Sequence, residues 1–179
     1  RPDSGRWPSV FFPLREVIER YALPRQPLFD LLDAFVQDVN NPPYETRADL
    51  LAYCRLSANP VGRLMLHLHG VADPRWLERS DAICSALQLI NFWQDLSVDL
   101  PRGRVYLPRA ECRSYGLDLS ELGACAIDDT AMRPLVASLC DWASSLMNEG
   151  APLAFALPGR SGWELRLVVQ GGLRVLEKM

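Results

Sequence analysis

The sequence predicts a single all-α domain over residues 1–179, and three observations lead to this fold class. Apolar residues recur at helical spacing, whereas no segment keeps the alternation of polar and apolar residues that is typical of strands. Proline, glycine and capping residues mark the ends of the periodic segments. The composition, with 49% hydrophobic and 23% charged residues, is that of an ordinary globular protein that can bury a sizeable core.

The first part of the chain contains two predicted helices. Residues 1–13 carry three prolines and a glycine and are expected to be irregular, and a short helix follows at residues 14–22. Pro27 suits the first turn of a helix and begins the second one, which ends at Asn40. The apolar positions of this second helix keep the spacing i, i+3, i+4, i+7, i+8 and i+11: Leu28, Leu31, Leu32, Phe35, Val36 and Val39.

A capping box opens the next predicted helix, which runs from about residue 47 to residue 70. Thr46 is the expected N-cap, and Asp49 follows three residues later. Pro60 lies inside this helix and must kink it or break it locally. Small residues around Pro60 suit the close approach of a second helix or of a ligand.

A long helix is expected from Asp73 through Asp99. Asp73 is a suitable N-cap, and Pro74 is placed at the first helical position, where its missing N–H does no harm. Shorter or later helices are expected at residues 108–115, with Gly116 as the C-terminal cap, at 118–125, at 130–148, and from a capping box at Ser161 and Glu164 to the end of the chain.

Oxygen-bearing side chains recur along the end of the long helix, at Asn91, Asp95 and Asp99. Each four-residue step turns by about 400°, so the three side chains form one stripe, and Gln88 lies a turn earlier beside it. Two carboxylates at this spacing repel each other by about 3 kcal/mol at roughly 6 Å and an effective dielectric near 20. A divalent hard cation would remove this repulsion. The alternative is an ordinary amphipathic helix whose aspartates face water.

The whole segment from Gln88 to Pro108 resembles the second aspartate-rich motif of the squalene/phytoene synthase family. It reads Gln, Asn, three residues, Asp, three residues, an acid, and then Gly-Arg-x-Tyr-Leu-Pro. Residues 53–63, Tyr-Cys-Arg-Leu-Ser-Ala-Asn-Pro-Val-Gly-Arg, resemble the helix that lines the substrate cavity of this family. The resemblance implies the helical fold of class I isoprenoid synthases, a prenyl diphosphate substrate and Mg²⁺ as cofactor.

The resemblance also implies a role for each of these residues. Gln37 and Asp38 occupy a place that the family keeps polar and acidic, although from the sequence alone Asp30, Asp33 and Asp38 are expected to be solvated. The implied catalytic metal ligands are Asn91, Asp95 and Asp99; Tyr53 and Gln88 would line the cavity, and Arg102, Arg104 and Tyr106 would bind diphosphate oxygens.

Within the family, residues 53–63 and 91–95 are most similar to the branch that makes hydroxysqualene in bacterial hopanoid biosynthesis. Residues 91–95 read Asn-Phe-Trp-Gln-Asp, where phytoene and dehydrosqualene synthases usually have Asn-Ile-Leu-Arg-Asp. The implied reaction converts presqualene diphosphate to hydroxysqualene with loss of pyrophosphate. Two alternatives stay open: a phytoene or dehydrosqualene type of synthase that condenses two prenyl diphosphates, and a non-catalytic helical scaffold of the same fold.

The first acidic motif of the family, an Asp-x-x-x-Asp cluster on a facing helix, has no counterpart before Asp38. The resemblance runs from about Pro24 to the end and therefore implies a domain that is incomplete at its N-terminus. We expect these 179 residues by themselves to be inactive, because one acidic helix supplies only part of a site that must hold metal ions and a diphosphate.

Other classes of function find little support in the sequence. A net charge of −3 without a basic run gives no indication of nucleic-acid binding, and neither a membrane-spanning stretch nor a signal-peptide pattern is visible. Cytoplasmic localisation is expected, and the family implies peripheral membrane contact for product release. The five cysteines are scattered and are expected to be reduced thiols, with neither a disulfide framework nor a zinc site: Cys54, Cys84, Cys112, Cys125 and Cys140.

Overall fold

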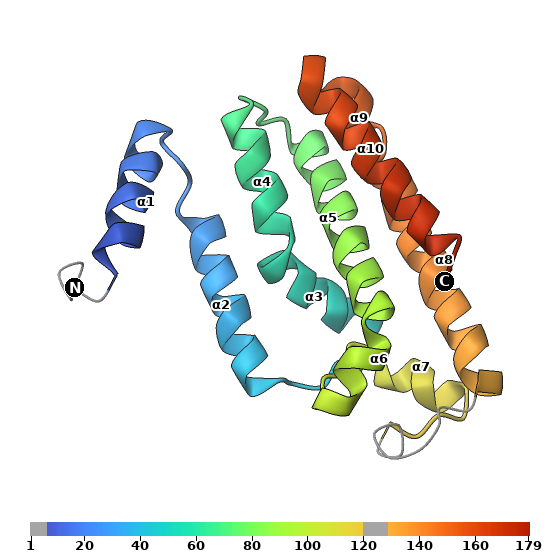
Figure 1. Cartoon of the computed structure of the whole chain (residues 1–179). Coiled ribbons are helices and arrows are strands. Elements are labelled where there is room, and N and C mark those ends of the chain that lie inside the picture. Colours follow the sequence, from blue (N-terminus) through green and yellow to red (C-terminus); the bar gives the residue numbers. More distant parts are fainter. Residues whose placement is uncertain (1–6, 120–128) are drawn as a thin grey trace.

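The computed structural model describes residues 7–119 and 129–179, and every regular element in these ranges is a helix (Figure 1). This confirms the predicted fold class. The α-helices are α1 (Pro8–Arg20), α2 (Gln26–Asn40), α3 (Arg47–Ser57), α4 (Asn59–Leu68), α5 (Pro74–Gln94), α6 (Leu96–Asp99), α7 (Arg109–Ser114), α8 (Asp129–Gly150), α9 (Leu153–Ala156) and α10 (Gly159–Leu176), and a 3₁₀ turn, η1 (Leu100–Arg102), follows α6.

Helix α5 is the central element and packs against α3, α4, α8, α9 and α10. Figure 1 shows α2 and α4 on one side of it and α8 and α10 on the other. Helix α1 lies beyond α2 and buries none of its own residues. Among the helices that the structure describes, none is long and apolar enough to cross a membrane. Large aliphatic side chains form the centre of the core: Leu50, Leu89, Leu135, Leu139 and Met147.

The predicted capping box at the start of α3 is present. The Asp49 amide donates to Thr46 Oγ1 over 3.3 Å, and the Thr46 amide donates to Asp49 Oδ2 over 2.8 Å. Two N–H groups that a helix start leaves without partners are therefore satisfied, so that α3 begins at a defined residue.

The predicted break near Pro60 is also present, since α3 ends at Ser57 and α4 begins at Asn59. The side chain of Asn59 is buried and lies 3.0 Å from Ser85 Oγ on α5. With its amide nitrogen on that side, Asn59 also reaches the carbonyl oxygens of Cys54 and Asp81. A buried amide thus binds polar groups of α3 and α5 at the place where the helix is interrupted.

Two glycines permit α5 to approach its neighbours closely. A Cβ atom at Gly62 of α4 would lie 2.6 Å from Cys84 Sγ and would also collide with Ser80. A Cβ atom at Gly150, the last residue of α8, would lie 2.6 Å from the carbonyl oxygen of Arg79. A Cβ atom at Gly150 would thus overlap the backbone of α5, so this contact requires glycine, whereas one at Gly62 would force the Ser80 and Cys84 side chains to move.

The start of the chain differs from the prediction. Helix α1 begins at Pro8, whereas residues 1–13 were expected to be irregular, and it includes Pro13. Pro8 occupies the first position of this helix, where proline is compatible with a helix start. Of the helix predicted at 118–125, only the first two residues are described, and they are not helical; the others lie outside the described residues.

The last helix also begins differently from the prediction. Helix α10 starts at Gly159 after Pro158, and its N-cap has no side-chain hydrogen bond. The capping box predicted at Ser161 and Glu164 is wrong: Ser161 Oγ lies 3.2 Å from His69 Nε2, and Glu164 accepts a hydrogen bond from Arg160 over 2.6 Å. Tertiary and side-chain partners therefore replace the local backbone bonds that the spacing suggests.

Candidate active site

The predicted stripe of oxygen-bearing side chains lies where α5 ends. The helix is interrupted at Asp95, whose φ of −92° and ψ of 7° leave the helical region, so the single helix predicted through Asp99 is wrong in this detail. The hydrogen bonds nevertheless continue, because the Asp95 amide donates to the Asn91 carbonyl over 3.1 Å and the Asp99 amide to the Asp95 carbonyl over 2.8 Å. The three residues thus remain on successive turns.

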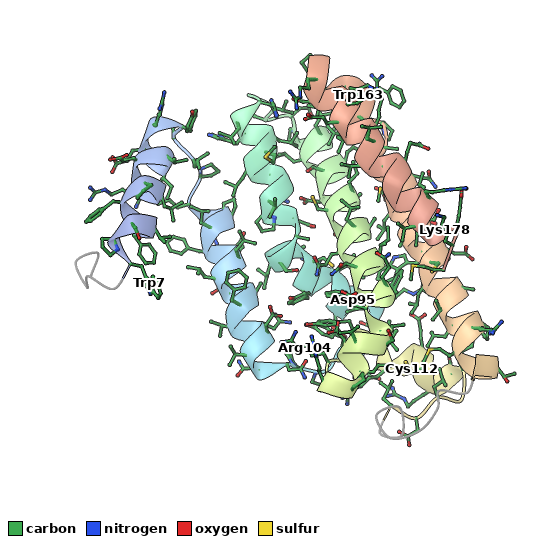
Figure 2. The ribbon with its side chains drawn as sticks, viewed as in Figure 1. Trp7, Asp95, Arg104, Cys112, Trp163 and Lys178 are labelled. Carbon is green, nitrogen blue, oxygen red and sulfur yellow. The ribbon has the colours of Figure 1, made fainter. Side chains whose placement is uncertain are left out.

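The loop that carries Arg102 and Arg104 follows Asp99 directly and turns back toward this stripe. The backbone amide of Arg104 donates to the Asp99 carbonyl over 3.0 Å, and Gly103 adopts the left-handed φ of +72° that the turn requires. The Gly103 carbonyl accepts a hydrogen bond of 2.8 Å from Asn41 Nδ2, just after the end of α2. Figure 2 labels Asp95 and Arg104 at the same end of the helices.

Four aromatic rings pack together beside the loop, on four different segments. Tyr106 stacks on Phe92 with ring centroids 3.8 Å apart and planes 2° from parallel. Tyr44 and Tyr53 complete the aromatic cluster, at 5.8 and 6.1 Å from the Tyr106 ring and 5.7 Å from each other. Two residues with predicted substrate-binding roles, Tyr53 and Tyr106, are therefore neighbours in the fold.

Asp38 of α2 reaches this cluster, although the sequence pattern placed it among the solvated acids. It is half-buried, and its Oδ1 atom accepts a hydrogen bond of 2.6 Å from the Tyr53 hydroxyl. Helical spacing could not reveal this contact, because Asp38 and Tyr53 belong to different helices. The signal that could have found it was the polar and acidic character that the family keeps at this place.

The charges around Tyr106 come from separate parts of the chain. Burial raises the pKa of Tyr106; the carboxylates of Asp38 and Asp99 raise it further, and the guanidinium of Arg104 lowers it. Asp38, Asp99 and Arg104 therefore all act electrostatically on one ring. Burial also raises the pKa of Tyr44 to about 12, so both hydroxyls stay protonated near neutral pH.

The structure gives fewer contacts for the remaining predicted site residues. Gln88 is half-buried one helical turn before Phe92, and Arg102 is exposed in the turn that follows Asp99. Within residues 7–119 and 129–179, the following side chains have neither a hydrogen bond nor an ion pair: Gln88, Asn91, Asp95, Asp99, Arg102 and Arg104. Other arginines in the same ranges are paired, among them Arg47 with Glu111 and Arg63 with Asp81.

The donor set at the end of α5 suits a hard cation. Asn91, Asp95 and Asp99 offer only oxygen ligands, and none of their side chains is engaged elsewhere in the described part of the chain. No three His, Cys, Asp or Glu side chains gather into a metal-sized cluster among the described residues. Mg²⁺ tolerates such a partial set, since it keeps several waters and commonly binds one or two carboxylates together with substrate phosphate.

Solved structures of known proteins share this fold. A squalene synthase, HpnC, from Alicyclobacillus acidocaldarius superposes with a TM-score of 0.86 at 38% identity, over 94% of this chain and 64% of that one. A dehydrosqualene synthase in complex with ligand gives a TM-score of 0.78 at 25% identity, over 90% and 56% of the two chains. The chain thus has the all-α fold of the isoprenoid synthases.

The sequence comparisons identify the family. The squalene/phytoene synthase family model matches residues 1–179, and the chain belongs to this family. It is 39% identical to hydroxysqualene synthase of Sinorhizobium fredii, over 78% of this chain and 48% of that protein. It is 36% identical to hydroxysqualene synthase of Rhodopseudomonas palustris, over 87% and 53%. Phytoene synthase of Thermus thermophilus is 31% identical, over 90% and 55%. The chain thus spans about half the length of these curated relatives.

Proposed function

We propose that the full-length polypeptide carrying this chain converts presqualene diphosphate to hydroxysqualene, with release of pyrophosphate and in the presence of Mg²⁺. The observation that carries the proposal is the meeting of three features at one end of the helices. They are the free donors Asn91, Asp95 and Asp99, the loop that carries Arg102 and Arg104 (the arginine loop), and the aromatic cluster. The similarity to two hydroxysqualene synthases supports this choice of reaction within the family.

The residues of this site have separable roles in the proposed reaction. Asn91, Asp95 and Asp99 would hold Mg²⁺, which when bound neutralises charge on the leaving pyrophosphate. Arg104 and Arg102 would donate hydrogen bonds to diphosphate oxygens, for which a planar guanidinium is suited. The backbone bond from Arg104 to Asp99 keeps these donors next to the acidic stripe.

The aromatic cluster has a different role, at the apolar part of the substrate. Departure of pyrophosphate leaves a carbocation, and the faces of aromatic rings attract cations. Phe92 and Tyr53 are buried, with 4% of each residue exposed, so this wall also limits the access of water. Tyr53 and Gln88 are assigned to the cavity wall in this proposal, and Tyr106 to the boundary between the cluster and the diphosphate.

A phytoene or dehydrosqualene type of reaction is the second candidate. It is favoured by the similarity to a phytoene synthase at 31% identity and to the dehydrosqualene synthase structure. The same end of the helices would then bind prenyl diphosphates that condense with each other. Both candidates use the same donors and arginines, so the residues near the leaving group cannot distinguish them.

Product analysis of the full-length polypeptide tests the proposal. The enzyme is incubated with Mg²⁺ and either presqualene diphosphate or farnesyl diphosphate, and the products and released pyrophosphate are identified. Hydroxysqualene from presqualene diphosphate supports the proposal, whereas condensation of farnesyl diphosphate to a hydrocarbon supports the second candidate. A non-catalytic scaffold would release no pyrophosphate from either substrate, and its calorimetric titration with pyrophosphate would not depend on Mg²⁺.

A further inference from the structure

Tyr53 and Asp38 form a hydrogen-bonded pair for which the roles described above give no use. The Tyr53 hydroxyl donates to Asp38 Oδ1 over 2.6 Å, which is the length typical of a charge-assisted O–H···O bond. Because the proton points at Asp38, this bond does not use the lone pairs of the phenol oxygen, which are hydrogen-bond acceptors. The Tyr53 oxygen can therefore act as a hydrogen-bond acceptor while its own proton is hydrogen-bonded to Asp38.

The surroundings of Tyr53 favour proton transfer along this bond over simple ionisation. Three aromatic rings enclose it, those of Tyr44, Phe92 and Tyr106, at centroid distances between 5.7 and 6.1 Å. Burial raises the pKa of Tyr53, and the hydrogen bond to Asp38 raises it further. Loss of the proton to bulk water is thus disfavoured, whereas its transfer to Asp38 while the oxygen gains another proton leaves Tyr53 neutral.

We propose that Tyr53 and Asp38 together accept the proton of the water molecule that ends the reaction, with Asp38 as the positioning residue that orients and relieves Tyr53. This inference rests on the proposed function, because the alternative condensation adds no water. The water oxygen forms a bond to the cationic carbon and gives a proton to Tyr53 Oη, while the proton of Tyr53 moves to Asp38 Oδ1. The result is a neutral alcohol, a neutral phenol and a protonated Asp38, which later returns its proton to solvent.

The competing base is the released pyrophosphate, which carries more negative charge than any side chain of the cluster. The two candidate bases depend on different side chains: Asp38 of α2 bonds to Tyr53 of α3, whereas the diphosphate is assigned in the proposed function to the arginines of the loop after α6. Removing the charge of Asp38 therefore affects one base and leaves the other in place.

Three variants of the full-length polypeptide test the inference. Asp38→Asn keeps an oxygen that can accept the Tyr53 hydrogen bond but removes the charge, and Tyr53→Phe keeps the ring but removes the hydroxyl. Asp38→Glu retains the charge and should therefore keep part of the alcohol formation that Asp38→Asn loses. Asp33→Asn makes the same change as Asp38→Asn at an exposed position of α2 and is the control. With presqualene diphosphate and Mg²⁺, two quantities are measured: pyrophosphate release, and the ratio of hydroxysqualene to hydrocarbons formed by proton loss from the cation.

We expect the ratio of alcohol to hydrocarbon to fall about a hundredfold or more in Asp38→Asn and Tyr53→Phe, because general bases contribute about 10²–10⁴-fold. Pyrophosphate release should fall less, and Asp33→Asn should match the unmodified enzyme. A purely structural role would lower alcohol and pyrophosphate together and leave the ratio within twofold, which would overturn the inference. An unmodified enzyme that releases pyrophosphate but forms no alcohol would overturn the proposed function and, with it, this step.

Discussion

The backbone amide of Arg104 donates a hydrogen bond to the carbonyl oxygen of Asp99. This bond uses no side-chain atom, so a substitution other than proline leaves both its donor and its acceptor in place. The guanidinium of Arg104 and the carboxylate of Asp99 can therefore be changed while the loop keeps its attachment to the end of α6. Substitutions at Arg104 consequently report on the head group and not on the position of the loop.

Arg104→Lys tests whether a planar, forked donor is needed. We expect a clear loss in kcat/KM, because a lysine ammonium is a point charge and cannot bind two diphosphate oxygens in parallel. Arg15, an exposed arginine of α1, gives the matched control Arg15→Lys. If Arg104 is only a surface residue, both variants will stay within about 0.5 kcal/mol of the unmodified enzyme in kcat/KM and in stability.

Among the three donors Asn91, Asp95 and Asp99, Asp95 is expected to be the most sensitive to substitution. It is the middle residue of the stripe and can share a metal ion with either neighbour, whereas water can replace an end ligand of Mg²⁺ in part. We expect Asp95→Ala to lower kcat/KM by about a hundredfold or more, the order of loss when one charge-stabilising group is removed. Asn91→Ala and Asp99→Ala should be less affected.

The control for these three variants is Asp33→Ala, which removes an exposed carboxylate from α2. Pyrophosphate release at several Mg²⁺ concentrations is the measurement, since a lost ligand should raise the concentration that is needed. Equal kcat/KM values for all four variants and the unmodified enzyme would contradict the assignment of Asn91, Asp95 and Asp99 as metal ligands.

Gly150 and Gly171 offer a matched pair for stability. In Gly150→Ala the new methyl group would lie 2.6 Å from the carbonyl oxygen of Arg79, and relief of this overlap must separate α8 from α5. We expect a loss of about 1–3 kcal/mol in the free energy of unfolding, as is usual for overpacking. In Gly171→Ala the new methyl group meets no atom within 4 Å, and a gain of up to about 1 kcal/mol is expected from helix propensity. Urea unfolding of both variants checks this.

Buried thiols should make stability depend on pH in the alkaline range. Burial raises the pKa of Cys54 to about 12 and that of Cys112 to about 11, from an ordinary value of 9.0. As pH rises, the thiols of the unfolded chain ionise first. The stability contributed by the protonated thiols is therefore complete below about pH 9 and is lost as pH rises toward the folded values.

The free energy of unfolding should consequently fall between about pH 9 and pH 11. Cys112→Ala removes one of the two groups, so its unfolding free energy should fall less steeply over this range than that of the unmodified chain. Urea unfolding at several pH values measures both slopes. Identical slopes would show that the Cys112 thiol ionises alike in the folded and unfolded states.

Local signals explain how much of the fold could be predicted. The capping box at Thr46 and the break before Pro60 depend on neighbours in sequence, and both are present. The interruption at Asp95 could not be predicted, because no proline or glycine marks it. Ser161 shows the limit of a spacing rule: its hydroxyl lies by His69, which is 92 residues away, and a local pattern carries no information on such a neighbour.

The candidate site divides in the same way. Asn91, Asp95, Asp99 and the arginines could be proposed from one segment, because a single motif holds them. The contact between Asp38 and Tyr53 depends on how α2 packs against α3, and the aromatic cluster depends on four segments that meet. A motif within one segment can be read from the order of residues. Contacts between segments depend on how the helices pack, which the order of residues does not give directly.

The hydrogen bond from Asn41 to the Gly103 carbonyl gives the arginine loop a second attachment, 62 residues away in sequence. Hydrogen bonds to Asp99 and to Asn41 hold the loop backbone at two positions. In the proposed function, diphosphate binding would therefore cost little conformational entropy in this loop. Ordering a flexible loop would subtract from binding energy, and here that entropic penalty is already met during folding. The loop is thus preorganised, and in the proposed function the affinity for the diphosphate would depend on the arginine head groups more than on any closing motion.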